Sequence, residues 1–153
     1  MLADASLADD AAQEVFVKAY LALDQFQMKA SFSIWLYRIA TNHCLDLLRK
    51  RNRQKTESWE ALLEKEGPKI EALFSVPPER FSQEQSELLY RLLSYLPETL
   101  RTVLVLREIQ DLSYDEIAVT LKCSLDAVKS RLKRARKELV GKLRHLLKTS
   151  DVK

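Results

Sequence analysis

Basic side chains gather in two separate stretches of the 153-residue chain, where they could bind a polyanion. Five of the seven residues in 49–55 are basic, and residues 125–148 hold nine basic side chains against two acidic ones. Between them, residues 57–87 carry eight acidic and three basic side chains. This segregation indicates two polyanion-binding surfaces joined by a segment that does not bind polyanions.

The second basic stretch follows a short predicted helix and a tight turn. Ser113 and Glu116 form a capping-box pattern at a helix start, and Ser124 can cap the last helix. That last helix is predicted to bury Val128, Leu132, Ala135 and Leu139. A short helix, a turn and a basic second helix make the helix-turn-helix that enters the major groove of DNA. A solvated cationic helix in an ordinary bundle is the alternative.

The composition favours helices throughout. Two Gly and four Pro leave few turn-forming residues, so we predict an all-α protein of two small helical domains joined by a flexible linker. A period of three and four residues predicts a first helix over residues 10–23, with an apolar stripe of Ala12, Val15, Phe16, Ala19, Tyr20 and Leu23. Ser31 or Ser33 can cap a second helix that reaches about Arg51, with a core of Trp35, Leu36, Ile39, Ala40, Leu47 and Leu48.

The middle of the chain lacks a sustained period. It contains Gly67-Pro68 and Pro77-Pro78, so we predict a linker over residues 54–81 with one short helix over 58–66. The predicted domains are therefore residues 1–53 and 82–148, on either side of this linker.

Several classes of protein receive no support from the sequence. No run approaches the 18 apolar residues of a membrane span, and residues 1–20 do not resemble a signal peptide, so we expect a cytoplasmic protein. Cys44, Cys123, His43 and His145 lack the spacing of a zinc site, and both cysteines are expected to be small buried or half-buried residues. Catalytic triads, phosphate-binding Gly loops and acid–base pairs are not recognisable, so we expect neither an enzyme nor a cofactor.

Two longer stretches resemble one family. The sequence DDAAQEVFVKAYLALDQFQ, followed by FSIWLYRIATNHCLDLLRKR, resembles region 2 of bacterial sigma factors. The sequence YLPETLRTVLVLREIQDLSYDEIAVTLKCSLDAVKSRLKRARKEL resembles their region 4. The two stretches in this order, with a short linker and no region 3 between them, resemble the extracytoplasmic-function group.

The resemblance implies partners and roles for particular residues. The implied partners are core RNA polymerase, through its β′ clamp and β flap, promoter DNA and an anti-sigma factor. The surface that binds the β′ clamp would consist of Asp10, Gln13 and Glu14. Asn42 matches the position that captures an unstacked base of the −10 element, and an amide can offer that base a donor and an acceptor. The other implied −10 contacts are Lys29, Arg38, Arg49, Lys50, Arg51 and Arg53. The implied −35 contacts are Lys129, Ser130, Arg131, Lys133, Arg134 and Arg136.

The sequence departs from the family pattern at two places that affect the fold. Only nine residues precede Asp10 where the family has a further helix or two, so region 2 is expected to be incomplete and Phe16, Leu36 and Ile39 to lack an apolar partner layer. Lys122 occupies a turn position where Gly is common, so it must adopt a left-handed or strained backbone. A stand-alone helix-turn-helix regulator and a truncated sigma factor that acts as an interaction module remain alternative functions.

Overall fold

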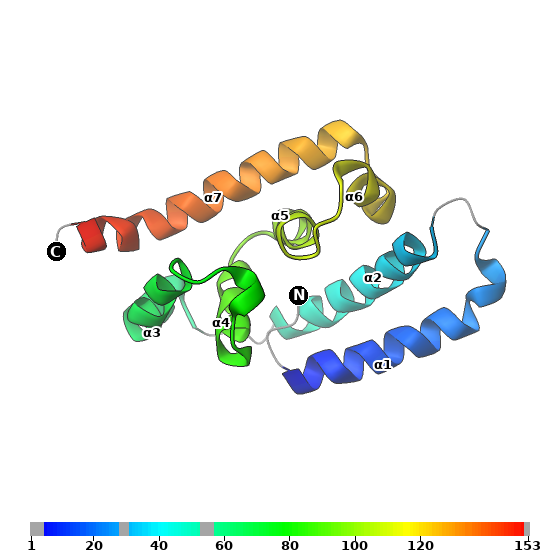
Figure 1. The fold of residues 1–153 in the computed structure, drawn as a ribbon, viewed down its shortest axis with the longest axis horizontal. Coiled ribbons are helices and arrows are strands. Elements are labelled where there is room, and N and C mark those ends of the chain that lie inside the picture. Colours follow the sequence, from blue (N-terminus) through cyan, green and yellow to red (C-terminus); the bar gives the residue numbers. More distant parts are fainter. Residues whose placement is uncertain (1–4, 28–30, 53–56, 152–153) are drawn as a thin grey trace.

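The computed structural model describes residues 5–27, 31–52 and 57–151, and every regular element in these ranges is helical (Figure 1). The elements in chain order are α1 (Ala5–Leu21), η1 (Leu23–Gln25), α2 (Phe32–Asn52), α3 (Trp59–Leu73), η2 (Pro78–Arg80), α4 (Gln83–Leu93), α5 (Glu98–Leu104), η3 (Val105–Ile109), α6 (Tyr114–Leu121) and α7 (Leu125–Asp151). The η3 segment is a π-helical turn that continues α5. The all-α prediction is confirmed.

The predicted helix-turn-helix consists of α6 and the first half of α7. The Oγ of Ser113 accepts a hydrogen bond from the backbone N–H of Glu116 (3.1 Å), and Oε1 of Glu116 accepts one from the N–H of Ser113 (2.9 Å). Ser124 caps α7, since its Oγ accepts from the N–H of Ala127 at 3.0 Å. Both predicted caps are confirmed, so the start of each helix is determined by residues only three positions apart.

The buried side of α7 packs against α5 and α6. The fully buried residues of α7 are Val128, Leu132 and Ala135, while Leu139 is half-buried at the edge of the same core. The neighbouring helices contribute Leu100 and Val103 from α5 and Ile117 from α6. In Figure 1, α7 lies across the top of the molecule with α5 and α6 directly beneath it.

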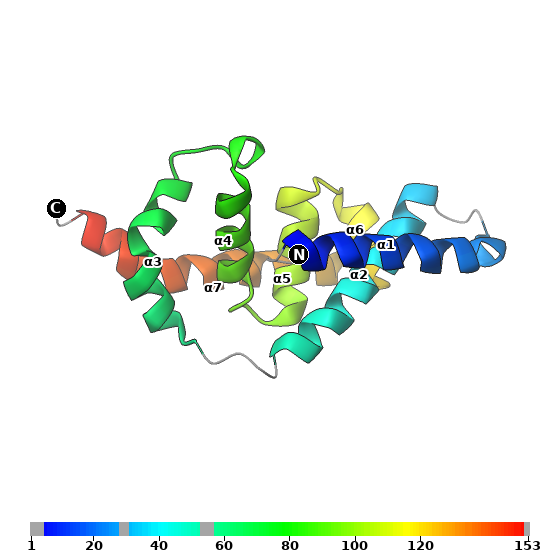
Figure 2. The same ribbon diagram turned by 90° about the horizontal axis from the view of Figure 1, so that it is seen from below.

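The apolar stripe predicted for α1 is only partly buried. Val15 and Ala19 are buried, but Phe16 and Tyr20 are 64% and 78% exposed. The buried line runs instead through Ala11, four residues before Val15. Because α1 packs mainly on α2 (Figures 1 and 2), a single neighbour covers one narrow side, and the rest of the predicted stripe faces outward.

The second helix, α2, lies between α1 and α6. Ser31 caps it by accepting a hydrogen bond from the N–H of Ile34 (3.2 Å). Of the six core residues predicted for this helix Leu48 is buried, and the other five are half-buried. Ile34, which was not predicted, is 6% exposed and belongs to the same apolar core as Ile117 and Val128. Thus α2 contributes directly to the core of the second half of the chain.

The third helix, α3, is longer than predicted. It runs through Gly67 and Pro68 to Leu73, well past the expected end at residue 66. A proline inside a helix costs about 3 kcal/mol. Each fully buried leucine or isoleucine stabilises by about 1.5–3 kcal/mol, so Leu62 and Ile70 together offset that cost. Their partners lie in α4 and α7, and they are Leu88, Leu92 and Leu143.

The turn before α7 gives a testable consequence for stability. Lys122 ends α6 with φ 53° and ψ 48°, as expected for a left-handed turn residue. Glycine adopts this conformation without the steric cost of Cβ, so Lys122→Gly is expected to raise the free energy of unfolding by about 1 kcal/mol. The matched control is Lys133→Gly, which places glycine in the exposed middle of α7. This variant should lower the free energy of unfolding by about 1 kcal/mol. Urea unfolding measures both, and equal losses would contradict the assigned strain.

Candidate nucleic-acid interface

The exposed side of α7 is a continuous basic surface. Lys129, Ser130, Lys133 and Arg134 are all exposed, opposite the buried line of Val128, Leu132 and Ala135. Arg131 is half-buried and turns toward α2. Because spacings of three and four residues share one side of a helix, the core packing of α7 determines which cations point outward.

Among the basic side chains of α7 that the structure describes, Arg136 is the one with a carboxylate partner. Its Nη2 donates to Oε1 of Glu108 at 2.6 Å, and its Nε donates to the same oxygen at 3.2 Å. The hydrogen bond to Glu108 is the largest cause of a raised pKa for Arg136. Both side chains are about half exposed, so the pair is of the weak, solvent-screened kind.

The second group of predicted contacts lies on α2. Arg38, Asn42 and Arg49 line one cleft of about 250 Å³, opposite Thr99 and Thr102 of α5. Arg131 of α7 also lines this cleft, so the two predicted DNA-contact groups meet there. Lys50 is exposed at the end of the same helix. The side chains of Lys29, Arg51 and Arg53 lie outside the described part of the structure.

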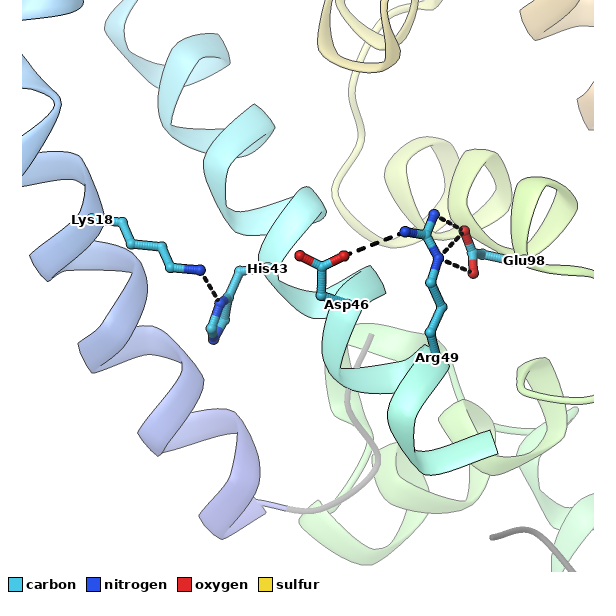
Figure 3. A network of polar contacts seen from close by, with 5 residues as sticks. All are labelled: Lys18, His43, Asp46, Arg49 and Glu98. Atoms are coloured by element: carbon cyan, nitrogen blue, oxygen red, sulfur yellow. Dashed lines mark hydrogen bonds and ion pairs between the residues drawn. The ribbon is translucent and has the colours of Figure 1, made fainter. Parts of the chain in front are cut away.

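Arg49 is held by two carboxylates (Figure 3). Its Nε donates to Oε2 of Glu98 at 2.9 Å and its Nη2 to Oε1 at 2.5 Å, while Nη1 donates to Asp46 at 3.3 Å. The hydrogen bond from Arg49 lowers the pKa of Glu98, and the same bond raises the pKa of Arg49. This two-pronged geometry is the one that arginine uses on carboxylates and on phosphates alike.

The predicted polymerase-binding residues Asp10, Gln13 and Glu14 are all exposed on α1. Behind them His43 of α2 is buried, and its Nδ1 accepts a hydrogen bond from Nζ of Lys18 at 2.7 Å (Figure 3). Its Nε2 lies 3.3 Å from Oε2 of Glu14. The histidine therefore contacts both a cation and an anion of α1, and it joins the surface of α1 to α2.

Aromatic rings gather where the chain enters α2. Phe26, Phe32 and Trp35 lie with ring centroids 5.2–5.8 Å apart, and Phe32 is half exposed. Trp35 is half-buried within this group, which agrees with its predicted place in the core of this helix.

Three contact partners of side chains on α2 and α7 were not predicted from the sequence. Glu98, Glu108 and Gln110 contact Arg49, Arg136 and Tyr37, respectively. Their partners are 28 to 73 residues away, so local patterns contain no trace of these contacts. In the described ranges no group of three or more potential ligands could hold a metal ion, and none of the helices there is long and apolar enough to cross a membrane. Cys44 and Cys123 are both half-buried free thiols.

A basic helix after a capped helix and turn, with a second cationic face on α2, defines an all-helical DNA-binding protein. Comparison with known proteins is more specific. Residues 1–54 match the family model "Sigma-70 region 2" and residues 86–139 match "Sigma-70, region 4". The chain is 36% identical to the ECF RNA polymerase sigma-E factor of Escherichia coli K12, over 91% of this chain and 75% of that protein. It is 39% identical to the RNA polymerase sigma-H factor of Pseudomonas aeruginosa, over 95% of this chain and 77% of that protein.

Solved structures show the same fold. CnrH in complex with the cytosolic domain of CnrY is 27% identical, with a TM-score of 0.63 over 93% of this chain and 74% of that chain. The sigma factor RpoE of Bartonella quintana, in complex with the anti-sigma factor NepR, has a TM-score of 0.61 at 24% identity over 90% of this chain and 81% of that one. The protein belongs to the extracytoplasmic-function group of the sigma-70 family, and it directs RNA polymerase to promoters. This family is not a class of enzymes.

The ion pair between Arg49 and Glu98 predicts how the free energy of unfolding changes at low pH. The pKa of Glu98 is lowered from 4.5 on folding, so the pair stabilises the fold above pH 4.5 and that contribution is lost as the pH falls through the lower folded value. Glu98→Gln should therefore reduce the free energy of unfolding at pH 7 by less than about 1 kcal/mol, since the pair is partly exposed. Near pH 3 the difference from the parent protein should shrink, as urea unfolding at both pH values would measure. A difference that grows at low pH would contradict this linkage.

Proposed function

We propose that α1, α2 and α7 divide promoter recognition among them. Two basic surfaces carry this proposal: the outward side of α7 and the side of α2 that bears Arg38, Asn42 and Arg49. Each surface belongs to one of the two segments that match sigma-70 regions 2 and 4. The proposed domains are residues 1–53 and 82–148, joined by residues 54–81, and α3 packs on the second of them.

The first helix is proposed to bind the β′ clamp of core polymerase. Asp10, Gln13 and Glu14 are exposed, and an acidic and amide surface suits a basic partner helix. The β flap is the proposed partner of the second domain. An anti-sigma factor is a further proposed partner, supported by the neighbouring structure of RpoE with NepR. We place the protein in the cytoplasm, where the polymerase is, and assign it no catalytic step of its own.

The two DNA contacts are proposed to differ in kind. Asn42 would read an unstacked base of the −10 element, with Lys29, Arg38, Arg49, Lys50, Arg51 and Arg53 holding the phosphates of that strand. On α7 the proposed contacts to the −35 element are Lys129, Ser130, Arg131, Lys133, Arg134 and Arg136. Arginine can bond two guanine acceptors at once, whereas most lysines neutralise phosphates without reading sequence.

The roles of two cations on α7 can be separated. Arg134→Ala is expected to weaken binding to the −35 element by roughly 1–3 kcal/mol and to leave random duplex much less affected, because a bidentate base contact is lost. Lys137 is exposed on the same helix, and we assign it to a phosphate. Lys137→Ala should therefore weaken binding to all duplexes alike and reduce the slope of log K against log salt by about 1. Fluorescence anisotropy with a promoter duplex selected by the holoenzyme and with a random duplex measures the loss of affinity and the salt dependence for each variant. Equal losses of Arg134→Ala on the two duplexes would refute its assignment.

The whole proposal is tested by initiation itself. With core polymerase, the parent protein should give a runoff transcript and permanganate-reactive thymines near the −10 element. Asn42→Ala should keep its affinity for core polymerase and lose opening by about tenfold, since only the base contact is removed. The absence of a transcript from the parent protein would contradict the proposal. If Asn42→Ala opened promoter DNA as fully as the parent protein, Asn42 would not belong to the recognition site.

A further inference from the structure

We propose that His43 is a positioning residue for the binding of core polymerase, and that it acts by holding the carboxylate of Glu14 through its Nε2. This rests on the proposed binding of the β′ clamp by α1. It adds a residue of α2 that is only 6% exposed, and that lies behind the proposed contact surface, to the groups that determine affinity for the clamp.

The imidazole of His43 lies between two charged side chains of α1. Glu14 and Lys18 are four residues apart, and at this spacing a glutamate and a lysine on one helix usually pair with each other. Here His43 enters from α2 and contacts both of them: Nδ1 lies 2.7 Å from Nζ of Lys18 (Figure 3), and Nε2 lies 3.3 Å from Oε2 of Glu14. The side chain of Glu14 is 67% exposed, so it can contact the ring and a partner protein at once.

Lys18 determines which nitrogen of the ring carries the proton. An ammonium group can only donate, so Nδ1 accepts, and the proton of the neutral imidazole is on Nε2. The Nε2 of His43 therefore presents an N–H to the carboxylate of Glu14. The two contacts depend on each other, because the bond from Lys18 selects the tautomer in which Nε2 is a donor.

The N–H on Nε2 is a buried donor without a hydrogen bond of its own. Its contact with Glu14 has the distance of an ion pair but not the alignment of a hydrogen bond, and Nε2 has no hydrogen-bond partner within the described residues. A buried donor without a partner is unfavourable, and a small rotation of the exposed Glu14 side chain completes the bond. The imidazole therefore favours the rotamers of Glu14 that lie over it, and it restricts this carboxylate before polymerase arrives.

Restriction before binding raises affinity. A side chain with many rotamers loses its freedom when a partner immobilises it, and this loss corresponds to roughly two- to twelvefold in affinity. A glutamate that His43 already holds avoids most of the loss. Leucine at this position keeps an apolar contact between α1 and α2 but has no donor, so His43→Leu should weaken binding to core polymerase by roughly three- to tenfold.

The first experiment is a double-mutant cycle in the full-length protein. Competition with a fluorescent parent protein for core polymerase gives the Kd of the parent, His43→Leu, Glu14→Ala and the double variant. His43→Leu should weaken binding by roughly three- to tenfold in the parent, and by less than about twofold once Glu14 is alanine. Equal losses in both backgrounds would overturn the proposal, because a histidine that only stabilises the fold affects both alike.

The matched control is the same cycle with Asp10→Ala, which removes a carboxylate of the same proposed surface, one turn before Glu14. Within the described ranges neither a hydrogen bond nor an ion pair joins Asp10 to His43, so the two changes should act independently. The two levels of failure are distinguishable. Unchanged affinity of Glu14→Ala would refute the clamp contact on which the inference rests. Lost affinity of Glu14→Ala together with unchanged affinity of His43→Leu would refute the positioning role alone.

The second experiment separates the two ring nitrogens. The amide of glutamine can take the place of Nε2, and the amide of the shorter asparagine can take the place of Nδ1. His43→Gln should therefore keep most of the affinity for core polymerase, whereas His43→Asn should lose as much as His43→Leu. Equal losses of the two amide variants would overturn the role of Nε2. Urea unfolding of all three variants is the check on stability, and an affinity that merely follows the free energy of unfolding would give His43 a structural role instead.

Discussion

One helix, α7, supplies both the apolar side that packs in the second half of the chain and the side chains that are proposed to reach DNA. Val128, Leu132 and Ala135 bury one side of it against α5 and α6, and that packing determines the direction of every cation on the other side. The caps of α6 and α7 and the left-handed Lys122 set the angle at which the two helices meet. The proposed recognition of the duplex therefore depends on core packing as much as on charge.

Two of the proposed DNA contacts form ion pairs with carboxylates of the protein itself. Arg49 bonds to Glu98 and Arg136 bonds to Glu108, and both carboxylates come from the short segment of α5 and η3. Partly exposed pairs of this kind contribute little to stability, so they can be exchanged for phosphates at small cost. The segment consequently faces α2 on one side and α7 on the other, and it balances the charge of both.

Local features of the fold could be predicted from the sequence, and features that depend on distant residues could not. The capping box of Ser113 and Glu116, the cap at Ser124 and the buried line of α7 each depend on residues a few positions apart. The length of α3 was missed because Ile70 is held by α4 and α7, which outweighs the break expected at Pro68. Likewise, Ile34 is buried by helices that are more than 40 residues away in the sequence, and the carboxylate that pairs with Arg49 is also that far from it. The spacing of apolar residues within one helix cannot predict contacts over that distance.

The π-helical turn of η3 has a mechanical consequence. Its wider ring closes between the N–H of Gln110 and the carbonyl of Val105, which inserts one residue into the helix that begins as α5. In an α-helix one residue corresponds to about 100° of rotation, so the insertion turns the end of this helix relative to its start. Glu108 can then reach α7 while Gln110 reaches α2. Deleting a single residue here would restore a regular helix and point these two side chains away from their partners, so the spacing of this turn is a geometric requirement in its own right.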